Sequence, residues 1–189
     1  MTRQSGPLYN EEYLRQGMHG DHTFVESIPR WAAQSNLAAL TSGEMQAVAV
    51  PLNPGDTAEV ITFVTGATHA VDVTAGFVAL YSNDPVPVLL DQSPDWGAAT
   101  FDANTPYSFA IPNPHTVVTG GIYYVAVSFT AGTVPTLRGT TVQNAVMAGD
   151  IGLGEAVLAM NAGTAVGGTA PATLEMHTVS ASIPYVVVS

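Results

Sequence analysis

From Glu44 onward, short apolar runs with a two-residue period alternate with turn-forming residues, and this rhythm constrains the fold more than any other feature. A period of two is typical of β-strands, while clusters of Gly, Pro, Asn and Asp are typical of turns. The expected strands are Met45–Pro51, Glu59–Thr65, Gly76–Ser82, Val88–Asp91, Tyr107–Ile111, Gly121–Thr130, Ala172–Val179 and Ile183–Val188. The pattern predicts an all-β protein, a single antiparallel β-sandwich that is jelly-roll-like.

The run Ile122–Phe129 is apolar on both faces for most of its length. A strand that is apolar on both faces is buried on both faces, so we expect this run to be a central strand. Val60–Val64 is a second candidate for a central strand.

The first 43 residues lack this rhythm and are interrupted by Gly6, Pro7, Gly17, Gly20 and Pro29. They predict an extended N-terminal arm (residues 1–43), with one helical turn at Glu11–Gln16, ahead of a sandwich domain (residues 44–189). The arm carries apolar side chains that need a surface, and we expect it to bind a partner through Tyr9, Tyr13, Leu14, Phe24 and Trp31. Two alternatives stay open: the arm folds over its own domain, or it reaches a neighbouring subunit.

Residues 145–170 form an irregular insertion in the strand rhythm. The segment predicts a short helix at Glu155–Met160, followed by a loop of small residues. A long excursion in a compact β domain is often functional. We expect a subunit contact through Ile151, Leu153, Leu158 and Met160, and the alternative is a loosely packed surface loop.

The charge balance narrows the range of partners. The 189 residues include 15 acidic residues, four Arg and no Lys, for a formal net charge of −11. Such a chain is not expected to bind nucleic acid directly or to dock on an anionic membrane. With only 10% charged residues, against about 25% in ordinary domains, the chain is expected to cover much of its surface with other protein subunits.

No motif predicts catalysis, and we expect no enzyme activity, no cofactor and no metal. The absence of Cys excludes disulfides and thiolate chemistry. His19-Gly20-Asp21-His22 is the densest polar cluster, and a solvated or interface segment is favoured over a metal site. The loop aspartates Asp84, Asp91, Asp95 and Asp102 lack the spacing of a calcium loop.

Three aromatic residues near these aspartates have two interpretations. Trp96, Phe101 and Tyr107 form a possible glycan shelf, on which a sugar ring stacks. The alternative interpretation is packing at the edge of the core.

Several stretches between Pro29 and Gly139 occur in a characteristic order and spacing: Ala33–Ser35, Leu40–Gly43, Val48–Leu52, Pro54–Thr57, Ile61–Gly66, Val78–Tyr81, Leu90–Ser93, Trp96–Ala99, Gly121–Val127 and Thr133–Leu137. Together they resemble the β-sandwich module of minor tail and other minor virion proteins of tailed phages that infect actinobacteria. The resemblance implies a structural virion protein without catalytic residues, built as a β-sandwich and displayed in several copies. It also implies that Trp31–Leu40 is extended rather than helical.

A module with only an arm and a C-terminal extension implies a capsid decoration or minor capsid protein, with a minor tail protein close behind. The expected partners are a major capsid or tail protein and further copies of the chain in a homotrimer. The expected location is the virion, assembled in the host cytoplasm. The alternative function is a carbohydrate-binding host-attachment module, and a hydrolase and a calcium-dependent adhesin are weaker rivals.

Overall fold

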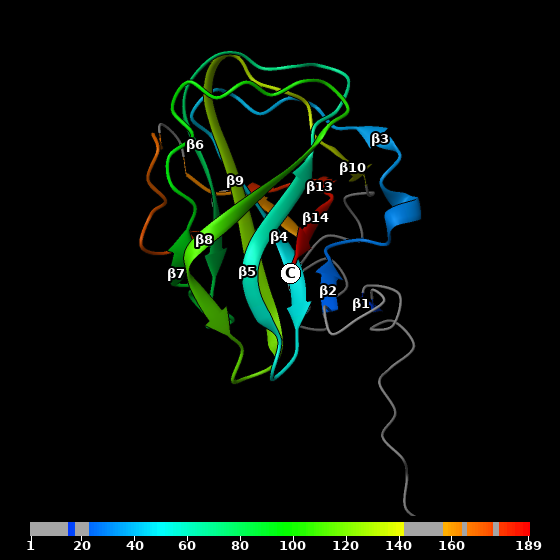
Figure 1. Ribbon diagram of the computed structural model, residues 1–189, viewed down its shortest axis with the longest axis vertical. Coiled ribbons are helices and arrows are strands. Elements are labelled where there is room, and N and C mark those ends of the chain that lie inside the picture. Colours follow the sequence, from blue (N-terminus) through cyan, green and yellow to red (C-terminus); the bar gives the residue numbers. More distant parts are fainter. Residues whose placement is uncertain (1–14, 18–22, 142–156, 164–165, 176–177) are drawn as a thin grey trace, which may run out of the picture.

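Two antiparallel β-sheets face each other in the computed structural model, which describes residues 15–17, 23–141, 157–163, 166–175 and 178–189 (Figure 1). The five-stranded sheet has the order β1 (Arg15–Gly17), β2 (Thr23–Glu26), β14 (Val186–Val188), β5 (Thr57–Val64) and β8 (Pro106–Thr116). The six-stranded sheet has the order β12 (Thr178–Val179), β11 (Ala159–Asn161), β4 (Met45–Leu52), β9 (Gly121–Thr133), β6 (Val71–Tyr81) and β7 (Leu89–Gln92). A small third sheet has the order β13 (Ser182–Pro184), β10 (Arg138–Thr141) and β3 (Ser35–Asn36). The arrangement confirms the predicted all-β sandwich.

The strand β9 lies between β4 and β6, and its residues 123–129 are all buried. The apolar run Ile122–Phe129 therefore forms a central strand, as its pattern predicted. Val60–Val64 falls in β5, which lies between β14 and β8.

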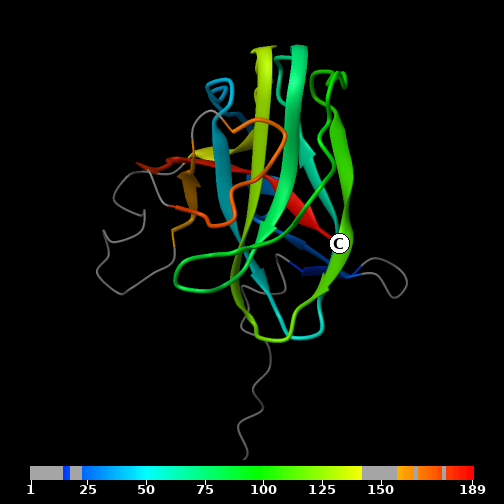
Figure 2. The same cartoon turned by 90° about the vertical axis from the view of Figure 1, so that its left-hand side faces the viewer.

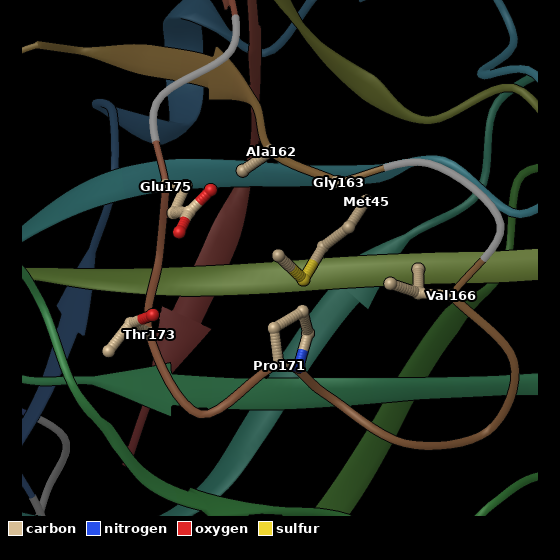
Figure 3. Close-up of a pocket in the computed structure, with 7 residues that line it drawn as sticks. All are labelled: Met45, Ala162, Gly163, Val166, Pro171, Thr173 and Glu175. Atoms are coloured by element: carbon tan, nitrogen blue, oxygen red, sulfur yellow. The ribbon is translucent and has the colours of Figure 1, made fainter.

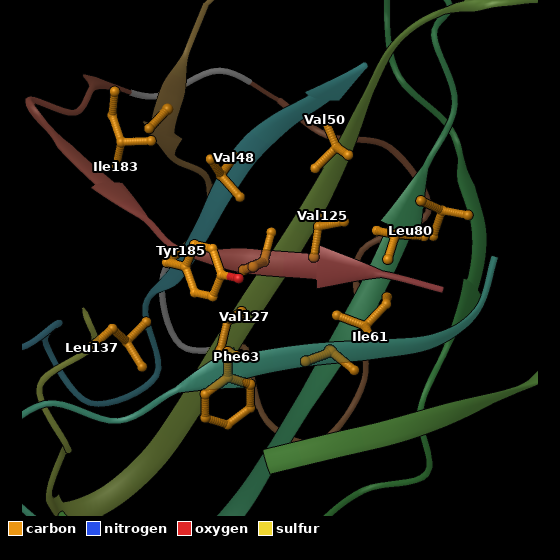
Figure 4. Close-up of a cluster of buried hydrophobic side chains, with 14 of the residues drawn as sticks. Val48, Val50, Ile61, Phe63, Leu80, Val125, Val127, Leu137, Ile183 and Tyr185 are labelled. Atoms are coloured by element: carbon orange, nitrogen blue, oxygen red, sulfur yellow. The ribbon is translucent and has the colours of Figure 1, made fainter. Parts of the chain in front are cut away.

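Alternating side chains of both sheets meet in an inner core (Figure 4). The six-stranded sheet contributes aliphatic side chains such as Val48, Val125 and Leu80, which are at most 1% exposed. From the opposite sheet, Ile61 and Phe63 of β5 are fully buried against them. The period of two thus turns one face of each strand toward the other sheet.

An aromatic cluster closes one side of this core. The Trp96 ring centroid lies 4.7 Å from that of Phe109, 4.8 Å from Phe129 and 5.0 Å from Phe101. Gly76 makes room for the indole, because a Cβ at that position would collide with the Trp96 ring. Trp96 and Phe101 are therefore structural residues of the core.

The opposite face of the six-stranded sheet is covered by the strap, which we define as residues 157–163 and 166–175. In Figure 2 the orange part of the strap crosses this face in front of the central strands. Beneath it, Ala126 of β9 pairs with Ala47 of β4 and with Ala79 of β6, so three alanines form a row across the sheet. These alanines pack in a second core with Met160 and Leu174 of the strap.

The edges of the two large sheets are short or rich in proline. The outermost strands β1, β12 and β7 have three, two and four residues, whereas the edge strand β8 has eleven. β8 contains Pro106, Pro112 and Pro114, which have no N–H to donate to an added strand. Contacts with other molecules are therefore expected through side chains rather than through added strands.

Three sequence predictions are wrong in their boundaries. The arm was expected to extend to residue 43. Of its two open alternatives, the pairings of β1 with β2, β2 with β14 and β3 with β10 support the one in which residues 15–17 and 23–43 fold onto their own domain. The helix expected at Glu155–Met160 is replaced at its C-terminal end by β11, which pairs with β4. The strand expected at Ala172–Val179 is a strand only at Thr178–Val179 in the part that the structure describes.

Candidate functional site

A cavity of about 400 Å³ opens between the strap and the sheet (Figure 3). Met45 and Pro171 lie at its centre, and Thr173 and Glu175 lie along one side. The Tyr81 hydroxyl donates a hydrogen bond to the Pro171 carbonyl oxygen (2.9 Å), which fixes the strap beside the cavity. Burial raises the pKa of the Tyr81 phenol, so this group is a stable donor. Among the lining residues that the structure describes, Glu175 is the only titratable one.

A second, smaller hollow of about 180 Å³ lies where the loops after β6 and β8 meet, and we call it the loop-end hollow. Its lining residues are Ser82, Asn83, Leu90, His115, Val118, Thr119 and Tyr123. The rings of His115 and Tyr123 lie 6.0 Å apart between centroids. The Tyr123 hydroxyl donates to the Thr119 carbonyl oxygen (2.9 Å). Burial, and secondarily the charge of Asp84, raise the pKa of Tyr123.

Exposed valines lie in the loops that form the loop-end hollow. Val118 lines it and is 83% exposed. Val88 exchanges two hydrogen bonds with Ser82, which also lines the hollow, and both Val88 and Val86 are exposed. Exposed apolar side chains of this kind suit contact with another apolar side chain.

The third candidate is the turn η1 (Arg30–Ala32), where Trp31 is 70% exposed. The turn is closed by hydrogen bonds from Ala32 N to Pro29 O (2.8 Å) and from Gln34 Nε2 to Trp31 O (2.7 Å). Trp31 is therefore an exposed aromatic side chain on a fixed backbone.

A buried carboxylate holds this turn in place. Glu26 is 0% exposed, and its Oε1 accepts from Arg30 Nε (2.9 Å), Arg30 Nη2 (2.8 Å) and the Tyr185 hydroxyl (2.6 Å). The Arg30 guanidinium also lies 5.5 Å from the centroid of the Phe24 ring. The hydrogen bonds to Glu26 raise the pKa of Arg30, while burial, followed by the bond to Glu26, raises the pKa of Tyr185 to about 12. The cluster is therefore structural: it fixes the position of Trp31.

The expected glycan shelf is wrong. Trp96 is 9% exposed and Phe101 is 1% exposed, because both rings pack in the inner core. Tyr107 is half-buried against Phe101, and its hydroxyl accepts a hydrogen bond from the Asp102 N–H (2.6 Å). Two of the three rings are therefore unavailable to a sugar, so the three do not form a shelf.

The expected subunit contact in the insertion is altered. Met160 is 2% exposed and packs in the second core, so its predicted contact with another subunit is wrong. Leu158 is 38% exposed, and its role stays a prediction. Ile151 and Leu153 lie outside the described residues, as do Tyr9, Tyr13 and Leu14.

In the described ranges, no three His, Asp or Glu side chains are grouped as metal ligands. Three of the four aspartates considered for calcium accept from local donors: Ser82 Oγ for Asp84 (2.6 Å), Asn113 N–H for Asp91 (2.6 Å) and Gly76 N–H for Asp95 (2.9 Å). The cluster His19–His22 lies outside the described residues. The described part of the chain also contains no helix of the length and apolarity needed to cross a membrane.

Sequence reasoning missed the loop-end hollow and the Glu26 cluster. The spacing of Glu26 and Arg30 by four residues is a visible signal for an ion pair, but Tyr185 is 159 positions from Glu26. Nothing local in the sequence marks Val118 or His115, because the hollow is assembled from separate loops.

The fold defines the class of the protein as an all-β sandwich. No protein-family model, curated protein or solved structure matches the chain.

Proposed function

We propose that the protein is a structural component of a tailed-phage virion, a capsid decoration or minor capsid protein that works by protein–protein contact. A minor tail protein of the same virion is the second candidate. The observation that carries the proposal is the exposed Trp31 on its fixed turn. Trp is among the residues that contribute most to protein interfaces, and a rigid position lowers the entropy lost on binding.

Two further features support a role in an assembly. Charged residues are only 10% of the chain, which favours a surface that other subunits partly cover. Residues Pro29–Gly139 also carry the ordered stretches that resemble virion β-sandwich modules.

The proposed anchor comprises residues 1–14, with Tyr9, Tyr13 and Leu14 as its apolar side chains. Burial of each large apolar side chain on a shell protein stabilises the contact by roughly 1.5–3 kcal/mol before the cost of ordering. On a symmetric shell, many copies make a modest single-site affinity effective.

The carbohydrate-binding alternative is not proposed, because its aromatic shelf is buried. Catalysis is not part of the proposal either.

The test is the location of the chain in purified phage particles. Mass spectrometry of gradient-purified virions should detect the chain, and a gold-labelled antibody should mark the head. Label on the tail would favour the minor tail assignment, and absence of the chain from particles would overturn the proposal.

A deletion of residues 1–14 tests the anchor, because it leaves every described strand in place. We expect incorporation into particles to fall strongly, while Val71→Ala, at an exposed site on β6, should incorporate normally. Unchanged incorporation of the deletion variant would refute the anchoring role.

A further inference from the structure

The exposed large apolar side chains in the described ranges fall into a projection and a cluster. The projection is Trp31. Val118 lines the loop-end hollow, and Val86 and Val88 are exposed in the loop 82–88, whose residues Ser82 and Asn83 also line it. Val71 and Leu158 are separate and less exposed. The molecule thus presents one protruding ring and one recess.

Arginine side chains flank the turn that carries Trp31. Arg30 precedes Trp31 and is held by Glu26. Arg138 donates from Nη1 to the Gln34 carbonyl oxygen (3.3 Å) and from Nη2 to Asn104 Oδ1 (2.6 Å). Its described partners are neutral, so its charge is not balanced by a carboxylate within hydrogen-bond distance. Because the pairing with Glu26 neutralises Arg30, Arg138 is the positive charge beside this turn, in a chain of net charge −11.

The loop-end hollow is complementary to the Trp31 turn in size and in charge. Its volume of about 180 Å³ is below the roughly 300–1,000 Å³ of ordinary ligand pockets, so it suits a single side chain. Tyr123 and His115 supply aromatic walls, and Leu90 and Val118 supply apolar ones. Asp84, which is exposed in the adjoining loop, brings a negative charge to the rim.

We propose that copies of this chain bind head to tail, with Trp31 of one copy inserted in the loop-end hollow of the next. The turn lies beside β3, whereas the hollow lies at the end of the sandwich where the loops after β6 and β8 turn back (Figure 1). The two halves of the contact lie on different parts of one molecule, so the interface is heterologous and produces a ring or a filament. Arg138, which is bonded to the turn at Gln34 O, would lie near Asp84 of the next copy and offset part of the repulsion between two acidic chains.

This inference rests on the proposed function, because a virion structural protein is displayed in several copies. In this proposal, Trp31 makes the contact between copies, and residues 1–14 make the contact with the shell protein.

The first test is sedimentation velocity of the full-length chain over a wide range of concentration. We expect wild type to associate, and Trp31→Ala to weaken association by about 30-fold, the effect of an interface hot spot. Val71→Ala, which alters neither surface, should associate as wild type does. A wild-type chain that stays monomeric at every concentration would overturn the contact.

The second test separates a head-to-tail contact from a symmetric one. Trp31→Ala keeps the hollow, and Val118→Arg keeps Trp31 but obstructs the hollow, at a site 83% exposed and therefore tolerant. At a concentration where wild type just associates, each variant alone should be largely monomeric and should keep the melting temperature of wild type. Their equimolar mixture should form a dimer and stop there, because only one functional interface can form. A mixture that stays monomeric would refute the proposal.

The outcome is independent of the test in particles. A monomeric chain that is found in virions would refute the contact between copies and leave the virion role standing. A chain that associates head to tail but is absent from virions would refute the virion role and leave the contact between copies standing.

Discussion

The two faces of the six-stranded sheet are both buried, but by different means. The inner face packs against a second sheet, whose side chains interlock with Val48, Val125 and Leu80. The outer face packs against the strap, an irregular segment with one short strand, β11. Alternate side chains of β4, β9 and β6 therefore pack in the inner core and in the second core.

The residue types on the two faces follow from what covers them. Two sheets pack about 10 Å apart, so branched side chains are needed to fill the space between them. On the outer face, the row Ala47, Ala126 and Ala79 leaves room for the strap. Small residues on a strand face thus indicate a closely packed cover.

The strap is held by hydrogen bonds as much as by apolar contact. Gln92 donates from Nε2 to Gly168 O (3.1 Å) and accepts at Oε1 from Ala170 N (2.6 Å). Leu89 N–H donates to Ala172 O (2.9 Å) and Leu174 N–H to Pro87 O (2.8 Å). Segments held in this way open at lower free energy than a packed core.

The largest expected effect compares two buried phenylalanines, one on each face. Phe63 lies in the inner core with five aromatic neighbours, while Phe77 lies in the second core. Both are 0% exposed. Phe63→Ala should lower the free energy of unfolding by about 5 kcal/mol and Phe77→Ala by about 3 kcal/mol, measured by urea denaturation. Equal losses would show that the two cores are packed equally well and would break the comparison.

The alanine row gives the next largest effect. Ala126→Leu places three extra carbon atoms beneath the strap and should cost about 2 kcal/mol. Hydrogen exchange should accelerate in residues 166–174 before it does in β9. Ala110→Leu makes the same substitution at an exposed position of β8 and should leave both measurements unchanged. If hydrogen exchange in residues 166–174 stayed as slow in Ala126→Leu as in wild type, packing of the strap would not depend on the alanine row.

Gln92 offers a sharper test, because its two hydrogen bonds can be removed separately. Gln92→Ala removes both bonds to the strap and should cost about 1.5 kcal/mol. Gln92→Glu keeps the acceptor for the Ala170 N–H but loses the donor to Gly168 O. We expect exchange at the Ala170 amide to be fast in Gln92→Ala and slow in Gln92→Glu. Equal exchange in both variants would mean that Gln92 does not fasten the strap.

Strands were predictable from the sequence where the alternation of apolar residues runs along the whole strand. Met45–Pro51 and Gly121–Thr130 were found because their alternation spans a whole strand, and they correspond to β4 and β9. β2 was missed because its four residues are ordered by β14, more than 150 positions away. Glu155–Met160 has the composition of a helix, but hydrogen bonds to β4 draw its end into β11.

The sites were less predictable, because they depend on partners far apart in the sequence. In the sequence, Trp96 next to an aspartate is as typical of a sugar-binding shelf as of the edge of a core. The indole packs in the core because Gly76 on β6 has no side chain to exclude it, and this distant residue is not evident from the local sequence. Trp31 was named as a contact residue from its isolation in a polar segment, and the structure shows it exposed. The loop-end hollow has no such signal, since its walls come from the loop regions around β7, β8 and β9.

The smallest expected effect concerns Tyr81, whose hydroxyl donates from the outer face of β6 to the strap at Pro171 O. Tyr81→Phe removes this neutral hydrogen bond and should cost about 1 kcal/mol at neutral pH. The wild-type chain should lose stability above pH 10, because the unfolded state releases phenol protons near the ordinary pKa of 10.0. Burial raises the pKa of Tyr81 in the folded state, so that state keeps the proton.

The expected decline is about 1.4 kcal/mol per pH unit for each such tyrosine. Tyr185 in the inner core has its pKa raised to about 12, so its contribution is lost between pH 10 and about 12. Each single Tyr→Phe variant should therefore flatten the alkaline decline by one proton, measured by urea denaturation at several pH values. If Tyr81→Phe left the slope unchanged while Tyr185→Phe flattened it, the strap would admit water to Tyr81, and the second core would be the more open of the two.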